Sequence, residues 1–318
     1  MLVAVSWCVV GLLALVALVR IVDWDQLWWP FVMLDAATIV LYLPAWPIAL
    51  LAALLRRRAL LLVALGLVAC QVAFVLPELA ASTPLPAWSA GAPTLRVFDA
   101  NIEAGNAHSA AYAAEIRRDD PGLITLEEAT PRQVVALRET GVLARYPHRF
   151  QVRWDNPFAF LVAARDPLVH PRVVMGNGEP LAVVATLVLP SGPVTLLTVH
   201  TVAPVPVSWH QWAGDLAILR RLVRRLGTRR LLVVGDFNAT WGNRGFVRIL
   251  STGLIDGAAA RGEDFQMTWS QTLGPLPPFV RIDHVLTGSG LAVRTIGLAN
   301  GPGSDHLAVL ATVAIRRR

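Results

Sequence analysis

Long apolar runs occupy the first quarter of the chain. Three of them carry no charge and approach the ~20 apolar residues that cross a bilayer as a helix: Leu2 to Val19, Ala36 to Leu55 and Ala59 to Pro77. The pattern predicts three transmembrane helices within residues 1–77. Asp35 stands at the start of the second run, and Pro44 and Pro47 interrupt it, which membrane helices tolerate.

The charges between these runs predict an orientation. The arginine triplet 56–58 separates the second run from the third, and because basic residues resist translocation, this loop is expected in the cytoplasm. The N-terminus then lies inside, and everything after Pro77 lies outside. Arg20, at the outer end of the first run, is expected to extend toward the lipid headgroups. The acidic and tryptophan-rich residues 23–29 are expected in an outer interfacial belt.

A second interpretation of the third run is a processing signal. Residues 56–70 combine a basic start, an apolar stretch and the tetrapeptide Leu67-Val68-Ala69-Cys70, which resembles a lipoprotein cleavage box. Its internal position favours an ordinary membrane helix over cleavage. Both interpretations keep the C-terminal region outside and tethered.

The pattern changes after residue 77. Residues 78–93 are rich in proline, alanine and serine and predict a linker. Beyond it, short β-branched runs alternate with amphipathic stretches, which is typical of an α/β domain over residues 94–318. The predicted strands are Leu95–Asn101, Leu123–Leu126, Phe160–Ala164, Ala182–Leu189, Val194–His200, Leu231–Asp236, Ile282–Leu286 and Leu307–Ile315. The predicted helices are Ala110–Arg118, Pro131–Leu143, Trp209–Leu226 and Gly245–Ser251.

Composition agrees with this division. The 318 residues are 55% hydrophobic with a mean hydropathy of +0.53, too apolar for an ordinary soluble enzyme. All 28 basic residues are arginine, which suggests a GC-rich bacterial genome. The net charge of +6 allows a polyanionic partner or an anionic membrane surface without requiring either. Cys8 and Cys70 both lie in apolar runs, so the α/β region needs no disulfide.

Polar side chains follow several predicted strands, where open α/β sheets generally build their sites. The strongest pattern is Val233-Val234-Gly235-Asp236-Phe237-Asn238, in which an apolar strand delivers an Asp and an Asn to one place. The others are Asn101, Glu128, His200, Asp283 and the pair Asp305-His306. Each alone has an ordinary explanation as a cap, a turn or an ion pair. Gathered in one domain, they indicate a site.

In this order and in these contexts, the residues resemble the endonuclease/exonuclease/phosphatase superfamily over about residues 94–315. The matching segments are the strand-end Asn101, Leu126-Glu127-Glu128 for the family's L-Q-E, Thr198-Val199-His200 for its T-x-H, Gly235-Asp236-Phe237-Asn238 for its G-D-F-N, Thr268-Trp269, Arg281-Ile282-Asp283 and Ser304-Asp305-His306. Glu127 replaces the usual Gln, and Ala100 stands where an aromatic residue is common. These two departures question substrate contacts, and a tyrosine phosphate clamp has no counterpart.

The resemblance implies a fold, a cofactor and roles. The fold is a four-layer α/β sandwich, here preceded by transmembrane helices. Mg²⁺, with Mn²⁺ as the alternative ion, would be held by Asn101, Glu128 and Asp305, since Mg²⁺ prefers one or two carboxylates plus water and substrate phosphate. Asp236 and Asn238 would orient the attacking water. His200 and His306 would contact the phosphate, with His306 acting either as general base or as imidazolium, and Asp283 would orient His306 and raise its pKa.

The implied function is metal-dependent phosphoester hydrolysis on the extracytoplasmic side of the cell membrane. The substrate is left open between nucleic acid and a lipid-linked or envelope phosphate; membrane lipids are expected partners, and no protein partner is expected. A linker of 16 residues spans at most ~50 Å, which favours the lipid-linked substrate. The basic stripe of Arg220, Arg221, Arg224 and Arg225 is interpreted as a solvated face, and Trp209 and Trp212 as core. The alternative class is a non-enzymatic membrane sensor on a decayed hydrolase scaffold, which the intact set of polar residues disfavours.

Overall fold

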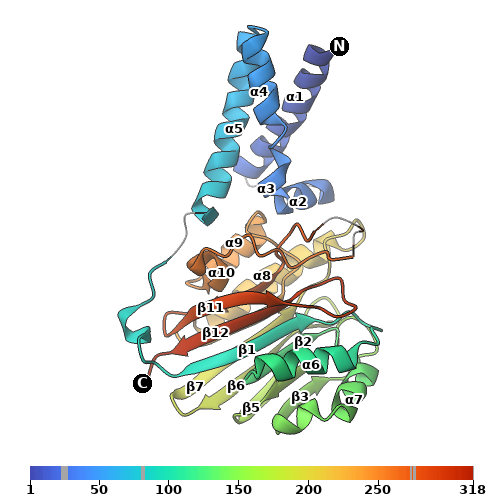
Figure 1. The fold of residues 1–318 in the computed structure, drawn as a ribbon, viewed down its shortest axis with the longest axis vertical. Coiled ribbons are helices and arrows are strands. Elements are labelled where there is room, and N and C mark those ends of the chain that lie inside the picture. The colour runs from blue at the N-terminus through green and yellow to red at the C-terminus, as the bar shows by residue number, and fades with distance from the viewer. Residues whose placement is uncertain (23–27, 80–82, 273, 275–276, 318) are drawn as a thin grey trace.

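Apolar helices rise from one side of a layered α/β domain in the computed structural model (Figure 1). The structure describes residues 1–22, 28–79, 83–272, 274 and 277–317. The predicted outer belt therefore falls largely outside the described residues, because residues 23–27 are not among them. The first helices are α1 (Leu2–Ile21), α2 (Trp29–Ala36), α3 (Thr38–Leu41), α4 (Ala45–Leu54) and α5 (Arg58–Leu79).

Two of these helices are long and apolar enough to cross a membrane. They are Leu2–Ile21 and Arg58–Leu76, and a third span is present only if the bent pair Trp29–Ala36 and Thr38–Leu54 counts as one. The predicted second run, Ala36 to Leu55, is not one continuous helix but is divided between α3 and α4. The chain bends by 81° between α2 and the following helix, and it breaks again before Pro44, whose ring removes a backbone donor.

Arg20 does not extend toward headgroups, so that prediction is wrong. Its side chain is buried, and its Nη1 donates to Thr38 Oγ1 (2.6 Å) and to the carbonyl oxygen of Gly242 in the α/β domain (3.0 Å). Asp35, which interrupted the second apolar run, lies 3.7 Å from the same guanidinium. A buried charge needs such partners, and the end of α1 is therefore tied to the domain below it.

Two six-stranded sheets form the centre of the α/β domain. One has the order β11-β12-β1-β2-β4-β3, and the other β5-β6-β7-β8-β10-β9. The strands are β1 (Thr94–Asn101), β2 (Leu123–Glu127), β3 (His148–Val152), β4 (Phe160–Ala164), β5 (Leu168–Met175), β6 (Pro180–Leu189), β7 (Gly192–His200), β8 (Leu231–Asp236), β9 (Ile255–Asp256), β10 (Asp283–Thr287), β11 (Leu291–Ala299) and β12 (Ala308–Ile315).

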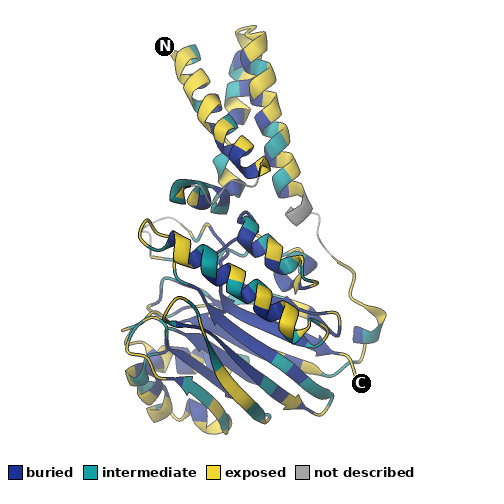
Figure 2. Ribbon diagram, turned by 180° about the vertical axis from the view of Figure 1, so that it is seen from behind, coloured by how far each residue is buried: buried dark blue, intermediate teal, exposed yellow. Residues whose placement is uncertain are grey.

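The sheets pack face to face and carry helices on their outer faces. Val97, Val162, Leu196 and Val234 belong to the apolar cluster between the two sheets, and Figure 2 shows the strands as the most buried part of the domain. One outer face carries α6 (Ser109–Asp119), α7 (Pro131–Glu139) and the 3-10 turn Val142–Arg145. The other carries α8 (Trp209–Leu226) and α9 (Arg244–Leu250). Helix α10 (Gly257–Arg261) packs against β10 and β11, which belong to different sheets. The predicted four-layer sandwich is confirmed.

The structure describes part of the segment between the helices and the sandwich. Helix α5 continues to Leu79, past the predicted start of the linker at residue 78, and residues 80–82 lie outside the described part. Residues Ala87–Ser89 form a 3-10 turn, and Thr83 N donates to Ala260 O (3.1 Å). The segment therefore contacts the domain at Thr83.

Candidate active site

Strand register places the predicted site residues in two facing rows. In one sheet His200 of β7 pairs with Asp236 of β8, and Asp236 pairs with Asp283 of β10. In the other, Asn101 at the end of β1 stands opposite Glu127, so Glu128 follows directly. Because the sheets are stacked, both rows meet at the same end of the sandwich.

Asn101, Glu128 and Asp236 form the corner where the two rows meet. Asn101 Nδ2 donates to Glu128 Oε1 (3.0 Å) and to Asp236 Oδ2 (3.1 Å). Glu128 Oε2 accepts from the backbone N–H of Ala104 (2.9 Å). Glu128 has a φ of 57°, a left-handed conformation that non-glycine residues adopt rarely and often at functional sites. Asn101 and Asp236 are almost fully buried.

His200 faces the same corner from β7. Its Nδ1 lies 3.0 Å from the carbonyl oxygen of Pro157, and because a carbonyl only accepts, Nδ1 donates. The Nε2 atom lies 3.7 Å from both Glu128 Oε1 and Asp236 Oδ2. Phe158 stacks at a tilt on the ring, with 5.7 Å between centroids. His200 is thus held with its Nε2 aimed into the corner.

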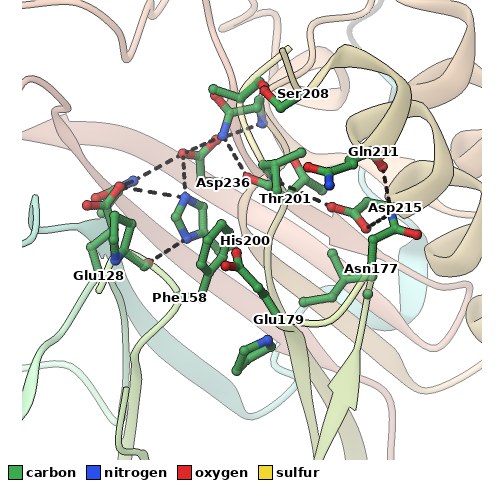
Figure 3. Close-up of a pocket in the computed structure, with 18 of the residues that line it drawn as sticks. Glu128, Phe158, Asn177, Glu179, His200, Thr201, Ser208, Gln211, Asp215 and Asp236 are labelled. Carbon is green, nitrogen blue, oxygen red and sulfur yellow. Dashed lines mark hydrogen bonds and ion pairs between the residues drawn. The ribbon is translucent and has the colours of Figure 1, made fainter. Parts of the chain in front are cut away.

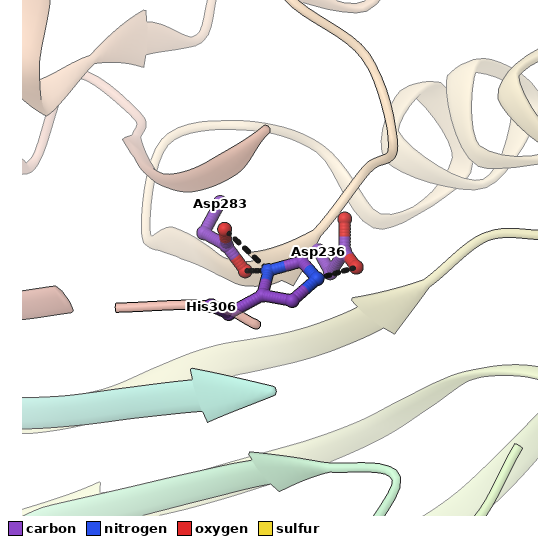
Figure 4. A group of neighbouring side chains, drawn as sticks. All are labelled: Asp236, Asp283 and His306. Carbon is purple, nitrogen blue, oxygen red and sulfur yellow. Dashed lines mark hydrogen bonds and ion pairs between the residues drawn. The ribbon is translucent and has the colours of Figure 1, made fainter. Parts of the chain in front are cut away.

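His306 and Asp283 form a buried pair on the other side of Asp236 (Figure 4). His306 Nδ1 donates to Asp283 Oδ2 (2.9 Å), while its Nε2 points toward Asp236 Oδ2 at 3.7 Å. Burial lowers the pKa of His306, but Asp283 and Asp236 outweigh it and raise the pKa to about 10. Burial would raise the pKa of Asp283, yet its pKa is lowered by the charged His306. The pair is therefore an imidazolium and a carboxylate at neutral pH.

Asn238 and Asp305 complete the site. Asn238, with a φ of 46°, donates its backbone N–H to Asp236 Oδ1 (2.7 Å), and its Nδ2 donates to Thr201 O (3.0 Å). Asp305 accepts from Trp269 Nε1 (2.7 Å) and lies 3.7 Å from His306 Nε2. Asp305 is thus on the His306 side of the site.

Two sets of residues could hold a cation. Asp236, Asp283 and His306 place ligand atoms within 4.8 Å of one another. A protonated His306 has no lone pair to offer a metal. His306 and Asp283 are therefore better described as an ion pair that lies beside Asp236. The corner of Asn101, Glu128 and Asp236 supplies carboxylate and amide oxygens, the donors that Mg²⁺ prefers. A divalent cation fits that corner by donor chemistry.

A cavity of about 770 Å³ opens from this end of the sandwich. Of the predicted site residues, all but Asp283 line it, and Asp283 lies behind His306. Figure 3 shows Glu128, His200 and Asp236 at one end and Asn177, Gln211 and Asp215 at the other. Asn177 Nδ2 bridges between Gln211 O (3.2 Å) and Asp215 Oδ1 (3.3 Å). Burial raises the pKa of Asp215 to about 6.

Sequence reasoning missed this second arm of the cavity. Its residues come from the loop between β5 and β6 and from the start of α8. Strand β5 was not predicted, so nothing in the sequence pointed to the loop after it. The contact of Phe158 with His200 is likewise formed only by the fold.

The two departures from the family pattern do not reach the cavity. Glu127 is fully buried and accepts from Thr198 Oγ1 (2.9 Å), and burial raises its pKa well above the usual range. Ala100 is buried in the apolar cluster under α6 and α7. The expectation that these positions affect substrate contacts is therefore wrong. Both are part of the packing beneath the site.

Helix α8 separates its charged and aromatic residues as expected. Trp209 and Trp212 are buried, and Trp212 Nε1 donates to Phe237 O (3.2 Å). Arg221, Arg224 and Arg225 are exposed at the far end of the helix, away from the cavity-lining Ser208, Gln211 and Asp215. The stripe is a solvated face, and it does not adjoin the cavity.

Comparison with known proteins gives the family. The sequence profile of the endonuclease/exonuclease/phosphatase family matches residues 96–306. The chain belongs to this family. Members of this family are generally phosphoesterases. A search of curated proteins finds no match.

Solved structures share the fold at low identity. TDP2 from D. rerio, complexed with a single-strand DNA product, is 15% identical with a TM-score of 0.58, covering 69% of this chain and 98% of that chain. An endonuclease/exonuclease/phosphatase protein from Beutenbergia cavernae is 18% identical with a TM-score of 0.53, covering 70% and 72%. The 3′ phosphatase NExo from Neisseria, bound to a product DNA hairpin, is 15% identical with a TM-score of 0.53, covering 68% and 98%.

Proposed function

We propose that this protein is a metal-dependent phosphoester hydrolase that acts at the extracytoplasmic surface of the membrane. The observation that carries the proposal is the corner itself. Asn101, Glu128 and Asp236 converge within hydrogen-bonding distance at the mouth of a cavity, with His200 and the His306–Asp283 pair on either side. This arrangement supplies a cation site, a water-orienting carboxylate and positive charge for a phosphate.

The residues take distinct roles in the proposed reaction. Asn101 and Glu128 would hold a divalent cation, with Asp305 adding a carboxylate from the His306 side. When bound, the cation neutralises charge on the phosphate and the leaving oxygen. Asp236 accepts a proton from the attacking water, and Asn238 holds Asp236 in place through its backbone N–H. The imidazolium of His306 and the Nε2 of His200 bind phosphate oxygens, and Asp283 keeps His306 charged.

The charge of the cavity favours a compact substrate over a nucleic-acid strand. Among the described residues that line it, six are carboxylates and none is an arginine. Binding along a polynucleotide relies on basic side chains at successive phosphates. In this cavity the positive charge lies at the end that contains His306. Glu179, Asp215 and Gln211 suit hydrogen-bond donors on the remainder of the substrate. Together with the apolar helices, this favours a single phosphoester on a membrane-borne molecule.

The test uses the full chain in detergent micelles. Turnover of a bis-aryl phosphodiester, a lipid phosphate monoester, DNA and RNA is measured with Mg²⁺ and with chelator. We expect Mg²⁺-dependent release from the small or lipid substrates. Glu128→Gln, which keeps size but removes charge, should raise the Mg²⁺ concentration for half-maximal turnover by an order of magnitude or more.

The matched control is Glu139→Gln, the same change at an exposed position on α7, and it should behave as the wild type. Turnover that persists in chelator excludes the metal role. Absence of turnover on every substrate, with phosphate binding retained, supports the non-enzymatic sensor instead.

A further inference from the structure

The turn that follows Asn238 is in contact with the apolar helices α1 and α2. Residues 240–243, here called the docking turn, lie between Asn238 and α9. Thr240 N donates to Asn243 Oδ1 (2.9 Å), and Asn243 N donates back to Thr240 O (2.9 Å). The turn is therefore closed on itself and presents its remaining polar atoms outward.

Helix α2 receives those polar atoms. Asn243 Nδ2 donates to Val32 O (2.9 Å), and Thr240 Oγ1 lies 3.3 Å from Ala36 O. The Val32 side chain is fully buried in the same apolar cluster as Phe237, the residue between Asp236 and Asn238. Figure 1 shows α2 lying across the top of the domain, between it and the long helices. Helix α2 thus packs as part of the domain's outer layer.

The end of α1 closes the same contact. Arg20 Nη1 donates to Gly242 O (3.0 Å), and its guanidinium lies over the ring of Trp241 at 5.9 Å. The same guanidinium lies over Phe74 of α5 at 4.6 Å. Residues from α1, α2 and α5 therefore meet at the docking turn.

At Gly242 the docking turn lies against the backbone of α2. A Cβ added there would lie 1.8 Å from Asp35 O and 2.8 Å from Asp35 C, both backbone atoms of α2. Gly242 does not need a left-handed conformation, so the requirement for glycine comes from steric contact with α2. A side chain at 242 would push α2 off the turn.

The docking turn supports one end of the segment that carries Asn238. The other end is fixed inside the domain, where Phe237 N donates to Ile282 O (3.0 Å) and Phe237 O accepts from Thr201 Oγ1 (2.7 Å). Between these two supports, Asn238 holds a φ of 46° and keeps its backbone N–H on Asp236. Such a conformation persists only when its surroundings enforce it.

We propose that α2 and the end of α1 are positioning elements of the active site, acting through the docking turn on Asn238 and Asp236. This inference rests on the proposed hydrolase function. The membrane part is then required for full turnover and is more than a tether. Misplacement of a catalytic group by about 1 Å can cost about 10²-fold in rate, so a small shift of the turn is sufficient.

The test compares full-length variants in the same detergent. Gly242→Ala should lower kcat about 10-fold or more, with KM changed far less, because positioning acts on the transition state. Gly297→Ala, the same change on β11 where nothing lies within 4 Å of the added Cβ, is the control and should match the wild type. Hydrogen exchange should become faster for amides of residues 236–244 in Gly242→Ala alone.

A second variant approaches the contact from the membrane side. Arg20→Met keeps an apolar stem but removes the donor to Gly242 O, and it should lower kcat in the same direction. Because both changes act through one contact, the double variant should be little worse than Gly242→Ala. Equal kcat and equal exchange in Gly242→Ala and Gly297→Ala would overturn the inference while leaving the hydrolase function intact. A wild type without turnover would instead reject the function, and the exchange data would still report on docking.

Discussion

At the scale of single residues, the His306–Asp283 pair gives the site its fixed positive charge. Asp283 sits behind the ring, where it cannot reach the cavity, and accepts from Nδ1 at 2.9 Å. The sequence pattern alone left His306 open between a general base and an imidazolium. The buried carboxylates around it decide for the imidazolium, since together they raise its pKa to about 10.

A double-mutant cycle tests that pairing. Asp283→Asn removes the charge behind His306 without touching the cavity, and His306→Ala should lower kcat by ~10² or more. Asp283→Asn should lower kcat too, and the double variant should be little worse than His306→Ala, because residues that act as a unit are non-additive. Losses that multiply would show that Asp283 acts independently, and the assignment of the pair would be withdrawn.

At the scale of elements, Asp256 ties β9, α10 and β10 together beneath the site. Its Oδ1 caps α10 by accepting from Ala258 N (3.0 Å), and its Oδ2 accepts from Arg281 (2.8 Å) and lies 2.9 Å from His284 Nδ1. Burial opposes ionisation, yet Arg281 and His284 outweigh it and hold the pKa of Asp256 well below its usual range. Arg281 therefore pairs with Asp256 rather than with its sequence neighbour Asp283.

Removing that carboxylate should destabilise the domain in a pH-dependent way. Asp256→Asn leaves Arg281 partly unpaired in the interior, a loss of about 3–5 kcal/mol. Because the folded pKa is depressed, the stabilisation is present above the unfolded value of ~4 and is lost as pH falls below it. The difference in thermal midpoint between the full-length variant and the wild type should be largest at pH 5–7 and should narrow steadily from pH 4 to pH 3.

The control for this series is Asp119→Asn. Asp119 pairs with the half-exposed Arg96 at the surface, and such pairs contribute about 0–1 kcal/mol. A constant difference between Asp256→Asn and the wild type at every pH would contradict the role assigned to the ionised carboxylate.

The elements that the sequence predicted best are strands that are buried at every position and a helix with one buried face. Helix α8 was predicted with its observed bounds, and strands β4 and β8 likewise. The missed strands are half-exposed or irregular: β5 contains Pro171, and β11 has a register shift between Val293 and Thr295. The end of α7 was placed too late, because Gly141, with a φ of 76°, ends the helical segment before Leu143.

The residues of the site likewise divide into those that the sequence predicted and those that only the fold brings together. Residues at strand ends were found because strand order brings them to one edge, and the structure places all eight together. The second arm of the cavity and the docking turn depend on contacts between segments far apart in the chain, such as Arg20 with Gly242. No local pattern encodes such contacts.

At the scale of the whole molecule, the docking contact bears on how many times the chain crosses the membrane. Helix α2 touches the α/β domain, so both lie on one side of the bilayer. Helix α5 leads from the arginine triplet 56–58 down to that domain (Figure 1). If α5 crosses, the chain can leave α2 and return through α5 to the same side only when the segment Thr38–Leu54 also crosses, and we therefore predict three crossings. The 17 residues of that segment span about 25 Å, close to the hydrocarbon thickness of ~30 Å.

Three crossings place the triplet opposite the domain, and the orientation then follows from the triplet's charge. Basic residues are retained in the cytoplasm, so the domain should lie outside. A reporter enzyme active only outside the cytoplasm should be active when fused after Ser89 and inactive when fused after Arg58. Activity at both positions would mean that α5 does not cross the membrane, and the prediction of three crossings would be wrong. The reverse pattern would place the active site in the cytoplasm.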